Sequence, residues 1–177
     1  MGVPNARNGI RGAVALALLL LGGTGSRSAP GDAGEERPTL AALPADFIEN
    51  RGQWTGGARF VARRGALRAA FHEDSLLIHQ GDETPLALRF VGASTEATLV
   101  GEGRRSGEYN FFFGNDPERW WSKVPAWSAV RYRELYPGID LRVREEAGRL
   151  EYDVMLAPRA DLGRVVIRAE NACGLEL

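Results

Sequence analysis

Three carboxylates in the last third of the chain are spaced as the acid and base of a glycoside hydrolase would be. Asp140, Glu151 and Asp153 alternate with apolar residues, so two paired strands would place them on one face. Arginines alternate along the same segment, and a solvated ladder of opposite charges explains the pattern without catalysis. We therefore predict no catalytic residue, and a hydrolase is the weakest of three functional hypotheses.

Histidine and cysteine are too few to indicate a metal site. Residues 72–76, His-Glu-Asp-Ser-Leu, begin like the zinc-protease motif, but leucine stands where the second histidine ligand must be. Apart from His72, the chain has only His79 and a single cysteine, Cys173, which can form no intrachain disulfide. We predict no metal and no cofactor, with both histidines at the surface or in turns. Cys173 is either an intermolecular bridge or a small buried side chain.

Residues 101–107, Gly-Glu-Gly-Arg-Arg-Ser-Gly, resemble a dinucleotide-binding loop in the spacing of their glycines. Such a loop connects a strand to a helix within a strand–helix–strand unit, and the flanking sequence has no such pattern. We expect an ordinary loop at this position.

Tryptophans are the remaining candidates for binding. Trp54, Trp120 and Trp121 could form an exposed aromatic platform that stacks on sugar rings or contacts another domain. The alternative is that they fill the core, as we expect of the phenylalanines in residues 109–113. Trp120 and Trp121 are adjacent, so they cannot both point inward from one strand. These three tryptophans are the predicted binding residues.

Period-two alternation predicts the elements that carry these side chains. Long helical periodicity does not occur, and short runs bounded by Gly, Asp, Ser or Pro recur. This pattern predicts an all-β, antiparallel sandwich-like domain of short strands with one or two short helical turns. The strands that we expect ahead of the final hairpin are residues 59–63, 67–72, 76–79, 85–91, 96–101 and 108–113.

Two short helical turns are expected in the second half of the chain. Asn115 or Asp116 can cap a helix whose first position is Pro117, and this helix would continue through residues 119–121. Residues 132–136, Tyr-Arg-Glu-Leu-Tyr, are a candidate for another single turn.

A type II turn and a hairpin follow. Pro137 presets the second position of the turn and Gly138 can adopt the positive φ that its third position needs. Residues 139–146 and 149–156 then alternate as two half-buried strands around Gly148. A two-residue loop would place opposite charges across the strands, and a bulged loop that uses Gly148 alone is the other possibility. The pairs predicted for the two-residue loop are Glu146 with Arg149, Arg144 with Glu151, Arg142 with Asp153, Val143 with Tyr152 and Leu141 with Val154.

The first residues have the pattern of a cleaved secretory signal at 1–28. Arginines precede an apolar run at 13–21, and small residues follow. The run is far shorter than the roughly 20 residues of a membrane span, so we expect no stable span after cleavage. Residues 29–43 are rich in Gly, Pro and acid and are predicted to be a flexible linker. Residues 44–177 then form one β-rich module.

The charge balance argues against a nucleic-acid partner. Three of the 22 basic residues lie in the predicted signal, so 23 acidic residues outnumber those that remain after cleavage. Binding to nucleic acid would require a concentrated basic face. The predicted location is secreted or otherwise extracytoplasmic, including the cell surface.

Five segments share a resemblance to one kind of module, and they are FIENRGQW (47–54), RFVAR (59–63), YNFFFGNDPERW (109–120), VPAWSAVRYRELYPGIDL (124–141) and LEYDVMLAPRAD (150–161). Together they resemble the N-terminal module of large bacterial secreted proteins that carry SBBP-type β-propeller repeats. The resemblance implies a non-enzymatic β-rich module ahead of the repeats. Members favour glycine where Arg159 stands, and they continue through further strands into the repeats, so the module is expected to be incomplete at its C-terminus.

The leading functional hypothesis is a non-enzymatic secreted or cell-surface module for structure or interaction. Its partner would be an adjacent β-propeller repeat domain, and a surface glycan or another protein is also open. The first alternative is a carbohydrate-binding module that uses the exposed tryptophans. The second alternative is the hydrolase that the carboxylate face suggested.

Overall fold

The computed structural model describes residues 45–64, 67–80, 84–146 and 149–172. The predictions for the signal peptide, the linker, Gly148 and Cys173 lie outside the described residues.

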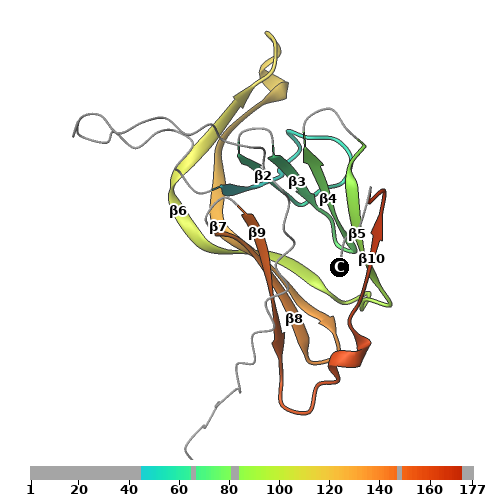
Figure 1. Ribbon diagram of the computed structural model, residues 1–177. Coiled ribbons are helices and arrows are strands. Elements are labelled where there is room, and N and C mark those ends of the chain that lie inside the picture. The colour runs from blue at the N-terminus through green and yellow to red at the C-terminus, as the bar shows by residue number, and fades with distance from the viewer. Residues whose placement is uncertain (1–44, 65–66, 81–83, 147–148, 173–177) are drawn as a thin grey trace, which may run out of the picture.

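Antiparallel strands make up the fold, which confirms the all-β class (Figure 1). One ten-stranded sheet has the order β10-β5-β4-β3-β2-β1-β7-β8-β9, and β6 pairs with β7 beside this path. The strands are β1 (Asp46–Glu49), β2 (Phe60–Arg64), β3 (Leu67–Phe71), β4 (Ser75–Gln80), β5 (Leu86–Val91), β6 (Thr98–Phe112), β7 (Trp120–Tyr136), β8 (Ile139–Glu146), β9 (Arg149–Leu156) and β10 (Val166–Glu170). Two single 3-10 turns are η2 (Pro117–Arg119) and η3 (Leu162–Arg164).

Strand β7 is the branch point of the sheet. Strand β6 pairs along one of its edges, and the other edge is divided between β1, at Ala126 and Trp127, and β8, at residues 129–136. Beyond β7 the sheet therefore separates into a first lobe of β1–β5 with β10 and a second lobe of β8 with β9. The lobes curl toward each other, and their facing side chains form the main core.

Two buried tyrosines of β7 form hydrogen bonds to strands of the first lobe. The hydroxyl of Tyr132 donates to the carbonyl oxygen of Ser75 at 3.2 Å. The hydroxyl of Tyr136 lies 3.2 Å and 3.1 Å from the carbonyl oxygens of Val91 and Val166. Burial raises the pKa of both phenols, so both remain neutral donors. Each hydroxyl therefore links β7 to the backbone of the first lobe.

The loop expected at residues 101–107 is instead part of β6. The two short strands predicted on either side join across it into one strand of 15 residues. Gly101 packs against the indole ring of Trp127, and a Cβ at this position would be 2.3 Å from a ring carbon. Gly103 has a φ of 63° and faces Ser128. The prediction was wrong because these glycines serve close packing inside a bulged strand and not a turn.

The capping pattern at Asp116 is confirmed, although the helix is shorter than expected. Its side chain accepts the Glu118 N–H at 3.0 Å, and Pro117 occupies the first helical position. The turn is a single 3-10 turn. Trp120 and Trp121 begin β7, which corrects the prediction that the helix carries them.

The segment around Pro137 is confirmed as a tight turn, since Gly138 has a φ of 71° and joins β7 to β8. The turn expected at residues 132–136 is instead a bulge in β7, where Glu134 has a φ of 50°. Asp140 accepts the Glu134 N–H at 2.6 Å, and the Glu134 carboxylate accepts the Gly138 N–H at 3.1 Å. Side-chain hydrogen bonds thus hold a backbone conformation that a pattern of apolar residues does not reveal.

The predicted register of the β8–β9 hairpin is confirmed. Arg144 lies opposite Glu151, and its guanidinium contacts the carboxylates of Glu151 at 2.9 Å and Asp153 at 3.2 Å. The opposite charges across the strands and the alternation of apolar residues therefore favour the same register. The further predicted pairs that the structure contains are Glu146 with Arg149, Arg142 with Asp153, Val143 with Tyr152 and Leu141 with Val154.

Candidate functional site

The far ends of β6 and β7 project from the sheet as a two-stranded arm, which we define as residues 108–124 (Figure 1). Strand β1 pairs with β7 only at Ala126 and Trp127, so the part of β7 before these residues has β6 as its strand partner. A two-stranded ribbon has little core of its own and is marginally stable in water. Packing between aromatic side chains supplies the missing contacts.

One face of the arm carries a row of stacked rings. Tyr109 stacks on Phe111 with ring centroids 6.3 Å apart, and Phe111 stacks on Phe113 at 6.2 Å. Trp54 meets Phe111 edge-on at 5.0 Å, and Trp121 meets Phe113 at 5.9 Å. Edge-on and offset rings are the favourable geometries for aromatic pairs. The rings of Trp54, Phe111 and Trp121 also cover a small second core made by Ile48, Val124 and Ala126.

The opposite face of the arm is more exposed. Phe112 lies opposite Trp120 in the strand register, and their rings meet edge-on at 5.5 Å. Phe112 is 62% exposed and Trp120 is 45% exposed. The structure therefore brings together two of the predicted binding residues, Trp54 and Trp121, and places Trp120 on the other face. Phe112 also corrects the expectation that the phenylalanines are core residues.

A bulge in β6 anchors the base of the arm to β1. The register of β6 shifts between residues 104 and 108. This shift lets Arg105 contact one carboxylate oxygen of Asp46 at 3.0 Å while the Tyr109 hydroxyl donates to the other at 2.8 Å. Burial, together with the hydrogen bond to Asp46, raises the pKa of Tyr109 to about 12. Asp46 is thus engaged on both of its oxygens.

We expect the Tyr109 hydrogen bond to be lost only at strongly alkaline pH. The folded pKa is raised above the usual value of about 10, so the stabilisation is complete below pH 10 and disappears as the pH rises through about 12. The measurement is an ultraviolet absorbance titration of the parent and of Tyr109→Phe. Their difference should titrate near pH 12, and a difference that titrates near pH 10 would contradict this contact.

The segment between β1 and β2 is held by two amide side chains. Asn50 donates to the carbonyl oxygens of Trp54 at 2.9 Å and Ala58 at 2.7 Å, and its own oxygen accepts backbone N–H groups. Gln53 is buried and donates to the carbonyl oxygen of Glu49 at 2.7 Å. Because these bonds replace regular strand pairing, they fix the position of the Trp54 ring beside the sheet.

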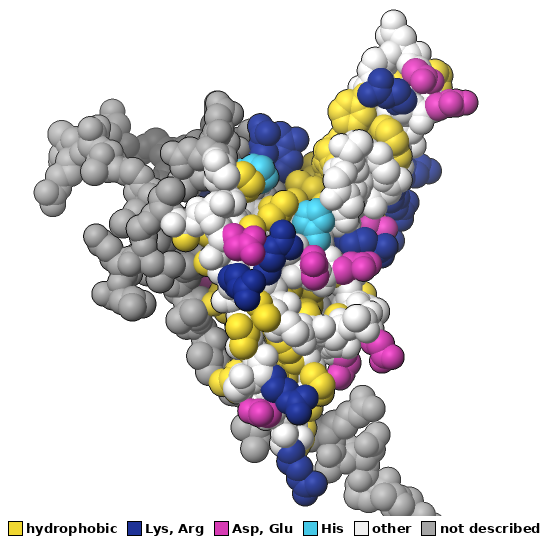
Figure 2. Space-filling view, turned by 90° about the vertical axis from the view of Figure 1, so that its right-hand side faces the viewer, with side chains coloured by type: hydrophobic (Ala, Val, Ile, Leu, Met, Phe, Trp, Pro, Cys, Tyr) yellow, Lys and Arg dark blue, Asp and Glu magenta, His cyan; other side chains and the backbone are white. Residues whose placement is uncertain are grey.

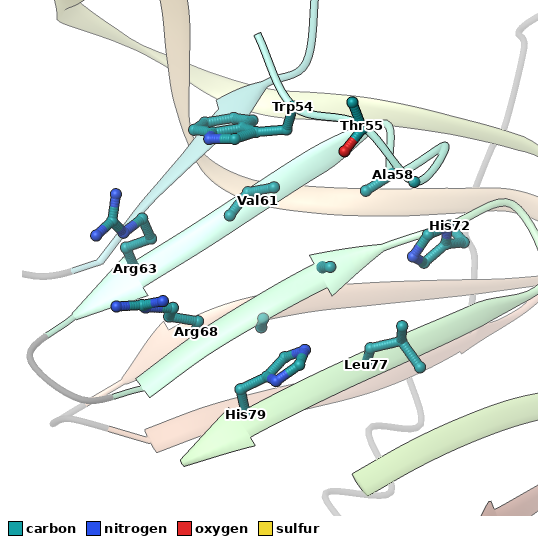
Figure 3. A pocket seen from close by; sticks show the side chains of 12 residues that line it. Trp54, Thr55, Ala58, Val61, Arg63, Arg68, His72, Leu77 and His79 are labelled. Atoms are coloured by element: carbon teal, nitrogen blue, oxygen red, sulfur yellow. The ribbon is translucent and has the colours of Figure 1, made fainter. Parts of the chain in front are cut away.

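A groove of about 370 Å³ lies between this segment and the outer face of β2, β3 and β4 (Figure 3). Its floor is apolar, with Val61, Ala70 and Leu77 side by side across the three strands. Trp54 flanks one side, as Figure 3 shows. In Figure 2 both histidines of the protein are visible on one face, and one of them lies near the base of the projecting arm. The remaining residues that line the groove are Thr55, Gly56, Ala58, Arg63, Arg68, Ala69, His72 and His79.

The carboxylates that suggested hydrolysis are all engaged by arginines. Arg131 donates to Asp140 at 2.9 Å, and Arg144 binds Glu151 and Asp153. Asp140 additionally holds the bulge at Glu134. The charge ladder predicted from the sequence is therefore present, and it gives each of the three acids a structural role.

Among the residues that the structure describes, no group of three or more His, Cys, Asp and Glu side chains is placed to hold a metal ion. No helix within the described ranges is long and apolar enough to span a membrane.

The fold and the arm define an all-β antiparallel module with an aromatic projection and a groove on its outer face. The chain belongs to a domain family of unknown function, DUF7948, whose family model matches residues 47–177. No curated protein and no solved structure matches the chain.

Sequence reasoning did not identify the groove. Its two arginines, Arg63 and Arg68, are directly opposite each other across β2 and β3. Only two residues separate these strands, so a tight hairpin register would have predicted the arginine pair. His79 lies opposite Arg68 because of the way β4 pairs with β3. The sequence indicates this second pairing less strongly than the first.

Proposed function

We propose that this chain is a non-enzymatic, secreted or cell-surface module whose arm packs against an adjacent β-propeller repeat domain. The observation that carries the proposal is the concentration of exposed aromatic side chains on the arm. Among the described residues, four of the six large apolar side chains most exposed to solvent are Tyr109, Phe112, Phe113 and Trp120.

Such a cluster is suited to a protein partner. Exposed apolar patches on a soluble module mark interaction surfaces, and aromatic side chains contribute most strongly at their centres. The arm presents rings on both of its faces, so a partner that surrounds the tip would bury more apolar area than one that lies on a single face. A repeat domain in the same chain would contact the arm at high effective concentration.

Two features of the sequence support this partner and this location. The segments at 47–54, 109–120 and 124–141 resemble the module that precedes SBBP-type repeats, and residues 1–28 have the pattern of a secretory signal. Members of that group favour glycine where Arg159 stands, and Arg159 has a φ of 70°, which glycine adopts without a Cβ penalty.

The proposal predicts propeller-repeat sequence next to this module in the same reading frame, and binding of that repeat domain in trans to the full chain. Phe112→Ser and Trp120→Ser should each weaken binding by about tenfold or more, as aromatic residues at interface centres do. Binding is measured by biolayer interferometry, with unfolding curves to verify that both variants fold.

Leu162→Ser is the matched control, because Leu162 is 43% exposed but lies in η3, outside the arm. It should leave binding unchanged. A reading frame without repeats would contradict the proposed partner. Equal affinity of the parent and both arm variants would contradict docking through the arm.

A further inference from the structure

The groove on the outer face of the first lobe contains a row of basic side chains. Arg63 of β2 pairs with Arg68 of β3, and Arg68 pairs with His79 of β4, so the three lie side by side across neighbouring strands. Directly opposite residues have Cβ atoms about 5 Å apart. Two guanidinium groups and one imidazole therefore border the same end of the groove (Figure 3).

This arrangement is unfavourable for the fold itself. Like charges directly opposite each other destabilise a pair of strands. Asp46 is the neighbour of Arg63 on β1, but both of its oxygens are engaged by Arg105 and Tyr109. Within the described part of the chain, no carboxylate forms an ion pair with Arg63 or Arg68. In the β8–β9 hairpin, by contrast, arginines lie opposite acidic residues, as Arg144 does opposite Glu151.

The rest of the groove is apolar and partly aromatic. Val61, Ala70 and Leu77 form its floor, and the Trp54 ring lies on the same side of the sheet as Arg63. A ligand that satisfies this surface must combine a negative group with a flat body that has an apolar face. Sugar rings have such a face and stack on tryptophan, and guanidinium forks bind carboxylate and sulfate oxygens through paired hydrogen bonds.

We propose that this groove binds an acidic sugar residue, with its anionic group between Arg63 and Arg68 and its ring on the apolar floor beside Trp54. His79 contributes a third donor next to the arginines. The site is separate from the arm face that carries Phe112 and Trp120, so it adds a ligand to the module independently of any repeat domain. Uronate carboxylates and sugar sulfates share the required chemistry.

The test is isothermal titration of the full chain with three oligosaccharides of equal length: a polyuronate, a sulfated glucan and a neutral glucan. The polyuronate, the sulfated glucan or both should bind, and the comparison between them identifies the anionic group. The neutral glucan should bind at least about tenfold more weakly. Arg63→Gln and Arg68→Gln should each reduce affinity by about tenfold to a hundredfold, as expected for charge-assisted hydrogen bonds.

Stability provides a second readout that separates binding from a structural role. Either substitution removes a repulsive pair, so the urea midpoint of each variant should be equal to or above that of the parent. Arg133→Gln is the matched control, since Arg133 is an exposed arginine of β7 outside the groove, opposite Thr98, and it should change neither affinity nor midpoint.

Several outcomes would overturn the proposal. One is equal binding of neutral and acidic glucans, and another is unchanged affinity in both groove variants. Destabilisation of both variants would assign the arginines to the fold. Tighter binding of a hexaglutamate peptide than of either acidic oligosaccharide would assign the groove to an acidic polypeptide instead.

Discussion

Replacement of Gly101 by alanine is expected to destabilise the fold by about 3 kcal/mol, at the upper end of the usual cost of overpacking a filled core. The added Cβ would lie 2.3 Å, 2.5 Å and 2.6 Å from three ring atoms of Trp127. Trp127 packs against the main core, so its ring cannot move without displacing other side chains. Urea unfolding followed by tryptophan fluorescence measures the change.

Gly107→Ala is the matched control for this substitution. Gly107 is also in β6, has no positive φ, and has no atom within 4 Å of the point that an added Cβ would occupy. Its replacement should change stability by less than about 0.5 kcal/mol. In a Trp127→Leu background the cost of Gly101→Ala should fall, because the steric conflict is removed. Equal costs in both backgrounds would show that the indole is not the obstacle.

The second large effect is expected at Tyr132. Tyr132→Ala should cost about 3–5 kcal/mol, because it removes a fully buried ring from the main core. The ring lies edge-on to Phe90 at 4.9 Å, so the loss includes an aromatic contact between β7 and the first lobe. The free energy of unfolding from urea titrations is the measured quantity.

Tyr132→Phe separates the ring from its hydroxyl. This variant keeps the packing but removes the hydroxyl donor to the carbonyl oxygen of Ser75, which retains the His72 N–H at 2.8 Å, so a loss of about 1 kcal/mol or less is expected. Equal destabilisation by phenylalanine and alanine would mean that the hydrogen bond, and not the ring, dominates. A change below about 1 kcal/mol for alanine would contradict the core position of this residue.

The parts of the fold that could be predicted are those in which local patterns agree with each other. In the β8–β9 hairpin, apolar alternation and the opposite charges of Arg144 and Glu151 select the same register. The turn at residues 137–138 requires both the fixed φ of Pro137 and the positive φ of Gly138. Each of these signals lies within a few residues of the structure that it determines.

Strands β6 and β7 could not be predicted in the same way. The glycines at 101 and 103 look like loop residues unless the positions of Trp127 and Ser128 are known. Trp127 and Val130 both contact the main core although they are three residues apart, which breaks period-two alternation. The break occurs where β7 exchanges β1 for β8, and this exchange depends on residues far away in the chain.

The candidate sites show the same limit. Trp54, Trp120 and Trp121 could be chosen as candidates because they are tryptophans. The face of the arm on which Trp120 or Trp121 lies depends on the pairing of Phe111 with Trp121 and of Phe112 with Trp120. That pairing follows a bulge, and bulges change which side chains share a face. The resemblance to SBBP-repeat proteins adds an expected partner, which remains a prediction until the arm variants are measured.

The shared strand β7 restricts how this sequence can vary. A substitution at Val124 or Ala126 changes the packing of the second core beneath the arm. A substitution at Val130 or Tyr132 changes the packing of the main core. Side chains of this single strand therefore pack in two separate cores, and few of its positions can be substituted without affecting one of them. The exposed tip of the arm has no such double constraint, so substitutions at Phe112 should cost less stability than substitutions at Val130 or Tyr132.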